Sequence, residues 1–162
     1  MRFPILTLAR VPEAVEPLDR LTPEVLSPDA DSVAAVAQIE RVVLEFARTE
    51  AEVRLLLEHR EACGYRRGDE VAGYAFIAAG GAGPIAALDP DDLPAILSHV
   101  EGGAAALGVE RLEFEAPSTN AVAIRHLLGR GFRIDPWINY LMSSRPFGQF
   151  DRFIGFSPPL FL

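Results

Sequence analysis

The stretch GPIAALDPDDL, residues 83–93, is the part of this chain that decides its fold. Its first half is an apolar run that ends at Leu88, and a short run of this kind bounded by glycine and proline predicts a buried strand. A helix is expected from about residue 93 to residue 107, because apolar residues recur there at three- and four-residue spacing. Pro94 fits the first turn of such a helix, so we expect Asp91 or Asp92 to be its N-cap.

The residues after this helix predict a second strand-helix unit. Residues 111–115 alternate polar and apolar side chains, which indicates a strand with one solvated face. Residues 121–128 predict a short helix that is capped by Thr119 or Asn120 and is followed closely by two glycines.

The residues before the central stretch predict two helices and a hairpin. Residues 32–46 place apolar side chains on one helical face, and a capping box beginning at Thr49 opens a second helix. Residues 64–78 predict a hairpin in which Gly68 supplies the positive φ of the turn. Residues 3–8 are expected to form a strand at a sheet edge, where the proline of this strand would be tolerated.

These elements describe a single domain of the mixed α/β class within 162 residues. We divide the chain into a proline-rich arm (1–30), a central domain (31–146) and an aromatic tail (147–162). Two closing strands are expected at residues 132–134 and 137–142. The tail is expected to pack on the domain or on a partner chain.

Composition excludes several classes of function. The formal net charge is −8 and the arginines form no stripe, so a nucleic-acid partner is not expected. Cys63 is the single cysteine, which rules out an internal disulfide and fits a reducing cytoplasm, where we expect the protein to reside. Residues 71–88 are uncharged, but glycines and a proline divide them into two strands, so no membrane association is expected. Charged residues interrupt the amino end, so no signal peptide is expected.

Residues 83–107 and 120–132 together resemble the core of an N-acetyltransferase of the GNAT superfamily. The Asn-x-x-Ala spacing that starts at Asn120 and the Gly131-Phe132 pair that closes the unit carry this resemblance. It extends from about residue 32 to residue 144. The chain also resembles the divergent second half of tandem GNAT proteins in three motifs. These are GPI at 83–85, DPDD at 89–92 and PPLFL at 158–162.

The resemblance implies an α/β (α+β) fold, a single GNAT-type domain in which helices flank a central mixed, mostly antiparallel sheet. It implies that an acyl group passes from an acyl-CoA to a small-molecule amine. It also implies that acetyl-CoA is the cofactor, with its pyrophosphate on the turn that opens the helix at residue 93.

Carboxylates stand where the family places glycines in that turn. A carboxylate ~4 Å from a phosphate charge costs on the order of 4 kcal/mol at an effective dielectric of 20. The helix dipole returns only about 0.3–1 kcal/mol. We therefore predict an altered cofactor site, and we assign no metal to the aspartates because their spacing is not that of an EF-hand. The candidate cofactor-binding residues are Leu88, Asp89, Asp91, Asp92, Leu93 and Asn120.

The catalytic groups are less complete than in the family. Many members carry a tyrosine as proton donor seven residues after the asparagine, and here that position is Leu127. Tyr140 is the candidate substitute acid. Glu113 and Glu115 share one strand face and are the candidate bases, acting through a water.

Three hypotheses remain open from the sequence. The first is an N-acetyltransferase with an atypical site, and the second is a non-catalytic GNAT-like module that binds a small molecule. The third is an interaction module that buries its proline-rich arm and its aromatic tail against an identical chain or a separate catalytic partner. We expect self-association, as a homodimer, in each case because the tail is apolar for a free terminus.

Overall fold

The computed structural model of the protein describes residues 1–16, 20–78 and 81–155. The helices are α1 (Ala30–Val43), α2 (Glu50–His59), α3 (Leu93–Ala106) and α4 (Ala121–Gly129), with 3₁₀ turns η1 (Pro90–Asp92) and η2 (Phe150–Arg152). The strands are β1 (Arg2–Arg10), β2 (Thr22–Val25), β3 (Glu61–Arg67), β4 (Glu70–Ala78), β5 (Gly81–Ala87), β6 (Leu112–Pro117), β7 (Arg133–Met142) and β8 (Phe153–Ile154).

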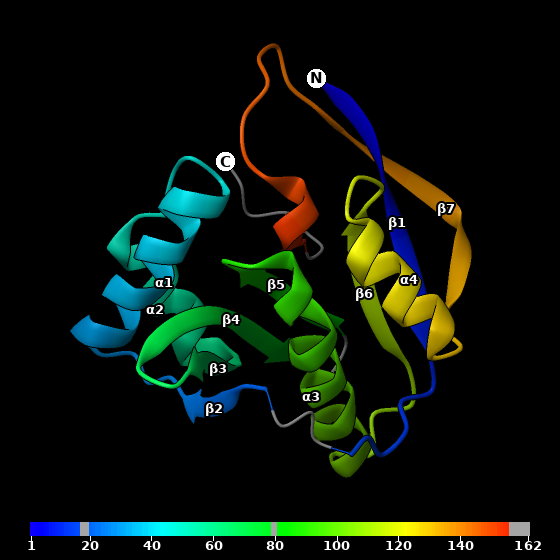
Figure 1. Cartoon of the computed structure of the whole chain (residues 1–162), viewed down its shortest axis with the longest axis horizontal. Helices are drawn as coiled ribbons and strands as arrows, with labels where there is room; N and C mark the ends of the chain where they lie inside the picture. The colour runs from blue at the N-terminus through cyan, green and yellow to red at the C-terminus, as the bar shows by residue number, and fades with distance from the viewer. Residues whose placement is uncertain (17–19, 79–80, 156–162) are drawn as a thin grey trace.

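The strands of the described residues form two sheets, in which all strand pairs are antiparallel. One has the order β6-β1-β7, and the other has the order β2-β3-β4-β5-β8. Figure 1 shows β6, β1 and β7 side by side on one side of the molecule, and β3, β4 and β5 on the other. The α+β class predicted from the sequence is confirmed.

Two hydrophobic clusters hold the helices against these sheets. The first joins α3 and α4 to the strands through buried residues such as Ile96, Leu127 and Phe114. The second joins α1 and α2 to the strands through residues such as Val36 and Leu56. The helix pairs therefore cover opposite faces (Figure 1). In the described part of the chain, no helix combines the length and the apolar character that crossing a bilayer requires.

Local signals in the sequence explain several elements. The capping box of α2 is present, because Thr49 N donates to Glu52 Oε2 at 2.7 Å and Glu52 N donates to Thr49 Oγ1 at 3.3 Å. Gly68 has a φ of 60° and turns β3 into β4, as the hairpin prediction required. Both features lie between residues 49 and 78, where α2, β3 and β4 follow one another directly along the chain.

The prediction that residues 3–8 form an edge strand is wrong in its position. These residues lie within β1, which is the central strand of the three-stranded sheet. Pro4 is tolerated there because it sits beyond the end of the β6 ladder, which begins at the pair Ile5 and Pro117. Pro4 O accepts from Ser118 N at 2.8 Å, so the missing N–H faces a side where strand pairing has already ended.

The prediction of two closing strands is also wrong, because residues 133–142 form the single strand β7. Pro136 interrupts the ladder without ending the strand. The register moves from Leu6 opposite Ile138 to Leu8 opposite Ile134, so two extra residues of β7 form an irregularity around the proline.

The aromatic tail contacts its own domain as far as the structure describes it. Phe150 packs against Phe3 with ring centroids 5.0 Å apart, and against Phe153 at 6.2 Å. Residues 156–162, which include the PPLFL motif, lie outside the described residues.

Candidate functional site

The candidate site lies where β5 leads into the acidic turn and α3. One edge of β5 is paired with β4. The opposite edge, which we call the β5 edge, is the side of Ile85 and Ala86 that faces β6. In the described structure, strand β6 does not pair with this edge, and β8 pairs with it, with Ile154 opposite Ile85 and Phe153 opposite Ala86. Phe153 and Ile154 are both buried.

Three further hydrogen bonds hold the segment that contains β8. Gly155 N donates to Glu115 O on β6 at 2.9 Å, so the segment bridges β5 and β6. Asn120 Nδ2 donates to Phe153 O at 3.2 Å. Arg152 Nη1 donates to Leu88 O at 2.7 Å. The chain therefore closes the β5 edge with its own residues 152–155.

Asn120 has two structural roles in this arrangement. Its side chain is fully buried, and its Oδ1 accepts from Ala123 N at 3.0 Å, which makes it the N-cap of α4. Its Nδ2 is used by Phe153 O. Both halves of the amide predicted to meet a cofactor thus have partners within the protein.

The acidic turn differs from the prediction that Asp91 or Asp92 would cap α3 through its side chain. Asp89 provides a cap instead, because its Oδ1 accepts from Asp91 N at 3.0 Å and so opens η1. Asp92 is the residue before α3 but makes no side-chain cap bond. It is buried and paired with Arg67 of the β3–β4 hairpin, which also lies 3.8 Å from Asp89.

Arg67 compensates part of the negative charge at the turn. Its hydrogen bond to Asp92 raises the pKa of the guanidinium. Nothing in the local sequence places Arg67 beside a turn more than twenty residues later. Asp91 is exposed and Asp89 is half-buried, so the turn still presents carboxylates to solvent.

The backbone amides of residues 88–93 are largely used within the chain. Leu88 N donates to Ala72 O at 2.8 Å, and Asp92 N donates to Asp89 O at 3.1 Å. Leu93 N donates to Pro90 O. A pyrophosphate needs free amides at a helix start. Because Asp91 N is also taken, by Asp89, and residue 90 is a proline, this turn does not fit the pyrophosphate of acetyl-CoA.

The candidate catalytic residues lie at different places on the three-stranded sheet. Glu115 is opposite Thr7 and Glu113 is opposite Ala9, whereas Tyr140 is opposite Pro4. Side chains alternate along a strand, so the two glutamates and Tyr140 lie on opposite faces. The structure does not bring the candidate acid and bases together.

The surroundings of these residues also differ. Glu113 is bonded to Arg111, whose Nε lies 2.5 Å from the carboxylate. Glu115 adjoins the segment at Gly155. Tyr140 is half-exposed, with the Arg2 guanidinium 4.5 Å from its ring centroid. Of the three, only Glu115 lies beside the β5 edge.

Leu127 occupies the position of the family's tyrosine and is buried in the core. Its neighbour His126 bonds through Nε2 to Ser98 Oγ of α3 at 3.1 Å, and burial lowers the pKa of the imidazole. This pair joins α3 to α4. In the described residues, no group of three or more histidine, cysteine or acidic side chains is arranged to hold a metal.

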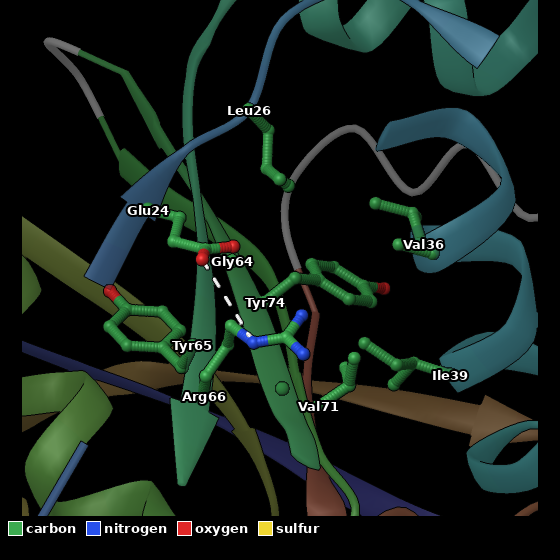
Figure 2. A pocket seen from close by; sticks show the side chains of 11 residues that line it. Glu24, Leu26, Val36, Ile39, Gly64, Tyr65, Arg66, Val71 and Tyr74 are labelled. Atoms are coloured by element: carbon green, nitrogen blue, oxygen red, sulfur yellow. Dashed lines mark ion pairs between the residues drawn. The ribbon is translucent and has the colours of Figure 1, made fainter. Parts of the chain in front are cut away.

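A small pocket lies between α1 and strands β2 to β4 (Figure 2). Glu24 and Arg66 form an ion pair of 3.9 Å beside it. Tyr74, at its inner end, donates to the buried Glu40 Oε1 at 3.0 Å. The pocket volume is about 40 Å³, far below the roughly 300–1,000 Å³ of small-molecule sites, so it is too small for an acyl acceptor.

Comparisons with known proteins agree with the fold. No protein-family model matches the chain, and no curated protein matches it significantly. A solved structure of a proposed acetyltransferase from Pyrococcus horikoshii has a TM-score of 0.67 at 12% identity, covering 93% of this chain and 49% of its own. A proposed GNAT-family acetyltransferase from Novosphingobium aromaticivorans has a TM-score of 0.62 at 16% identity, covering 86% and 63%. The structure of a Drosophila protein has a TM-score of 0.66 at 14% sequence identity, and the match covers 86% of this chain and 50% of the Drosophila chain.

At these identities the likeness is one of fold, and it supports the resemblance found in the sequence. The chain has a GNAT-like α+β fold. It spans about half to two thirds of these three solved chains, from 49% to 63% of their length.

Proposed function

We propose that this chain is a non-catalytic domain of the GNAT N-acyltransferase fold, in which residues 152–155 stand where active members hold acyl-CoA. The observation that carries this proposal is the pairing of β8 with the β5 edge. A linear ligand whose pyrophosphate lay on the turn at 89–92 would run back along the strand that leads into that turn. The amide groups of this ligand would then need to pair with the β5 backbone at Ile85 and Ala86, where Phe153 and Ile154 are already paired.

The cost of opening the β5 edge sets how weakly acyl-CoA would bind. Three hydrogen bonds, from Gly155, Asn120 and Arg152, contribute about 1 kcal/mol each. Exposing Phe153 and Ile154 costs roughly 1.5–3 kcal/mol each. Freeing the backbone returns about 1–2 kcal/mol per residue.

The bonds and the burial together cost about 6–9 kcal/mol and the four freed residues return about 4–8 kcal/mol, so the net cost is about 1–2 kcal/mol, which weakens the apparent affinity about tenfold. The carboxylates at the turn weaken it further. At millimolar acetyl-CoA we expect no saturable heat in calorimetry and no rise in the melting temperature. A saturable isotherm in the micromolar range would refute the proposal.

The second candidate is an acyl-CoA-dependent N-acyltransferase whose β5 edge opens in use. Two observations favour it, namely that β8 is only two residues long and that Glu115 lies beside the segment. A matched pair of variants separates the two functions. Gly155→Pro removes the N–H that bonds to Glu115 O, whereas Gly155→Ala keeps it and places its Cβ at an ordinary 3.7 Å from the same oxygen.

The second candidate predicts that Gly155→Pro binds acetyl-CoA more tightly than Gly155→Ala and acetylates amines faster. The first predicts no binding by either variant. Both variants should keep the native circular dichroism spectrum, which shows that the comparison is made on folded protein.

A further inference from the structure

The side of β7 that faces α4 carries exposed apolar side chains. Ile134 is paired with Leu8 and Ile138 with Leu6. Leu8 lies in the core cluster that contains Leu127 of α4, and the side chains of paired residues point to the same face of a sheet. The exposed apolar residues on this side form a set that we call the α4–β7 face, namely Leu128, Ile134, Ile138, Tyr140 and Met142.

Leu128 belongs to this face because of its position on α4. His126, two residues earlier, bonds to Ser98 of α3, and two residues turn a helix by about 200°. Leu128 therefore points away from α3, toward the side of α4 on which Figure 1 shows β7. Packed helices lie about 8–10 Å apart and paired strands about 4.8 Å apart, so a second helix placed beside α4 would lie over β7.

The α4–β7 face lies in the basic part of a chain whose formal net charge is −8. Residues 116–150 contain four arginines and one acidic residue, Asp135. Because Asp135 follows Ile134 directly, its side chain lies on the opposite face of the strand, where it pairs with Arg111 at 2.6 Å. The α4–β7 face itself therefore has no carboxylate from β7.

Two exposed arginines border this face. Arg2 of β1 is paired with Met142, and its guanidinium lies 4.5 Å from the centroid of the Tyr140 ring. Arg125 precedes Leu128 by three residues and is its neighbour on the surface of α4. Among the described residues, neither arginine has an ion-pair partner. An apolar surface with positive charges beside it complements a ligand that is apolar on one side and acidic on its flanks.

We infer that the α4–β7 face binds an acidic amphipathic helix of a partner protein. The apolar stripe of this helix packs on β7 beside α4, and its carboxylates meet Arg2 and Arg125. A helix of about 18 residues is about 27 Å long, which matches the roughly 26 Å of strand from Ile134 to Met142. A second copy of this chain does not fit this face, because an interface formed by the same surface of both copies would bring the same arginines together. The inference does not depend on whether acyl-CoA binds, since β7 and the β5 edge belong to different sheets.

Trp137 provides a matched control on the other face of the same strand. It precedes Ile138 directly, and Leu141, which shares its alternation, packs against the second hydrophobic cluster. Met142 is 69% exposed and Trp137 is 82% exposed, so a glutamate at either position should leave the fold intact. Circular dichroism checks that both variants, Met142→Glu and Trp137→Glu, are folded.

Fluorescence anisotropy with two labelled peptides of about 18 residues tests the inference on the full chain. One peptide has leucines at helical spacing and glutamates beside them, and the other has a lysine in place of each glutamate. We expect the native chain to bind the glutamate peptide at least about 10-fold more tightly at low salt, with a smaller difference at high salt. Met142→Glu should weaken this binding at least about 10-fold, whereas Trp137→Glu should change it less than about 2-fold. Arg125→Glu should weaken binding of the glutamate peptide and strengthen binding of the lysine peptide.

Three results would overturn the inference. The first is that the glutamate peptide shows no saturable binding up to about 1 mM. The second is equal affinity for both peptides, which would indicate an apolar contact without charge recognition. The third is an equal loss of affinity in Met142→Glu and Trp137→Glu, which would place the contact away from the α4–β7 face.

Discussion

Replacement of Asn120 by alanine tests the account of how α4 and the β8 segment are held. The variant loses the N-cap bond to Ala123 N, worth typically about 1 kcal/mol. It also loses the hydrogen bond that Asn120 Nδ2 donates to the buried Phe153 O, at a cost of roughly 1–3 kcal/mol. The total is roughly 3 kcal/mol. For a domain of this size, this corresponds to a fall in melting temperature of roughly 6–12 °C.

The assay is chemical and thermal denaturation followed by circular dichroism. Asn120→Ser keeps an oxygen for the cap but has no amide donor, so it should lose only about 1–2 kcal/mol. Thr119→Ala is the control, since Thr119 is exposed and was the alternative cap in the sequence, and it should change stability by less than about 0.5 kcal/mol. Equal losses in Asn120→Ala and Thr119→Ala would refute the reasoning.

Three other predictions concern the rest of the domain. Gly73→Ala should destabilise the protein by about 1–3 kcal/mol or prevent its folding, because the added Cβ overlaps Ala86 O. Gly103→Ala places its Cβ in open space within α3 and should stabilise the protein by about 0.5–1 kcal/mol. Urea denaturation measures both changes. Thr49→Ala should cost about 1 kcal/mol by the same measurement and Thr49→Ser much less, since serine keeps the capping oxygen. Burial lowers the pKa of His126, so the unfolded state binds its proton more readily and stability should fall as the pH drops from about 7.5 to about 5.5, around the ordinary histidine value of about 6.5. That fall should be smaller in His126→Gln, and an identical fall in both proteins would contradict the assignment.

The sequence predicted the elements whose signals are local. The helix that follows residue 92, the capping box at Thr49 and the hairpin at Gly68 are all confirmed. Each rests on residues within one turn or one face of a single element. The order of these elements resembles that of the GNAT superfamily, and the fold comparisons support this resemblance.

Features that depend on distant partners could not be predicted. The partner of Asp92 is Arg67, and nothing in the spacing of these two residues indicates their contact. No local sequence signal indicates that β1 lies between β6 and β7, and Pro4 led to the prediction of an edge strand instead.

The candidate site could also be predicted only in part. Its aspartates were recognised from the local charge pattern, but the sequence did not indicate that residues 152–155 close the β5 edge. The apolar residues around Phe153 indicated only that the tail packs somewhere. The catalytic roles of Glu113, Glu115 and Tyr140 stay hypotheses, and the two faces on which they lie give no shared position for a substrate.

The central place of β1 has a consequence for how the protein is made. Ile5 is paired with Pro117 and Phe3 with Leu141, each more than a hundred positions further along the chain. The middle strand of this sheet therefore leaves the ribosome before both of its neighbours, β6 and β7. During synthesis the first strand must wait without its partners, so the final folding step is a long-range closure, which is intrinsically slow. The nascent chain is then most vulnerable to mispairing just before residue 142 emerges.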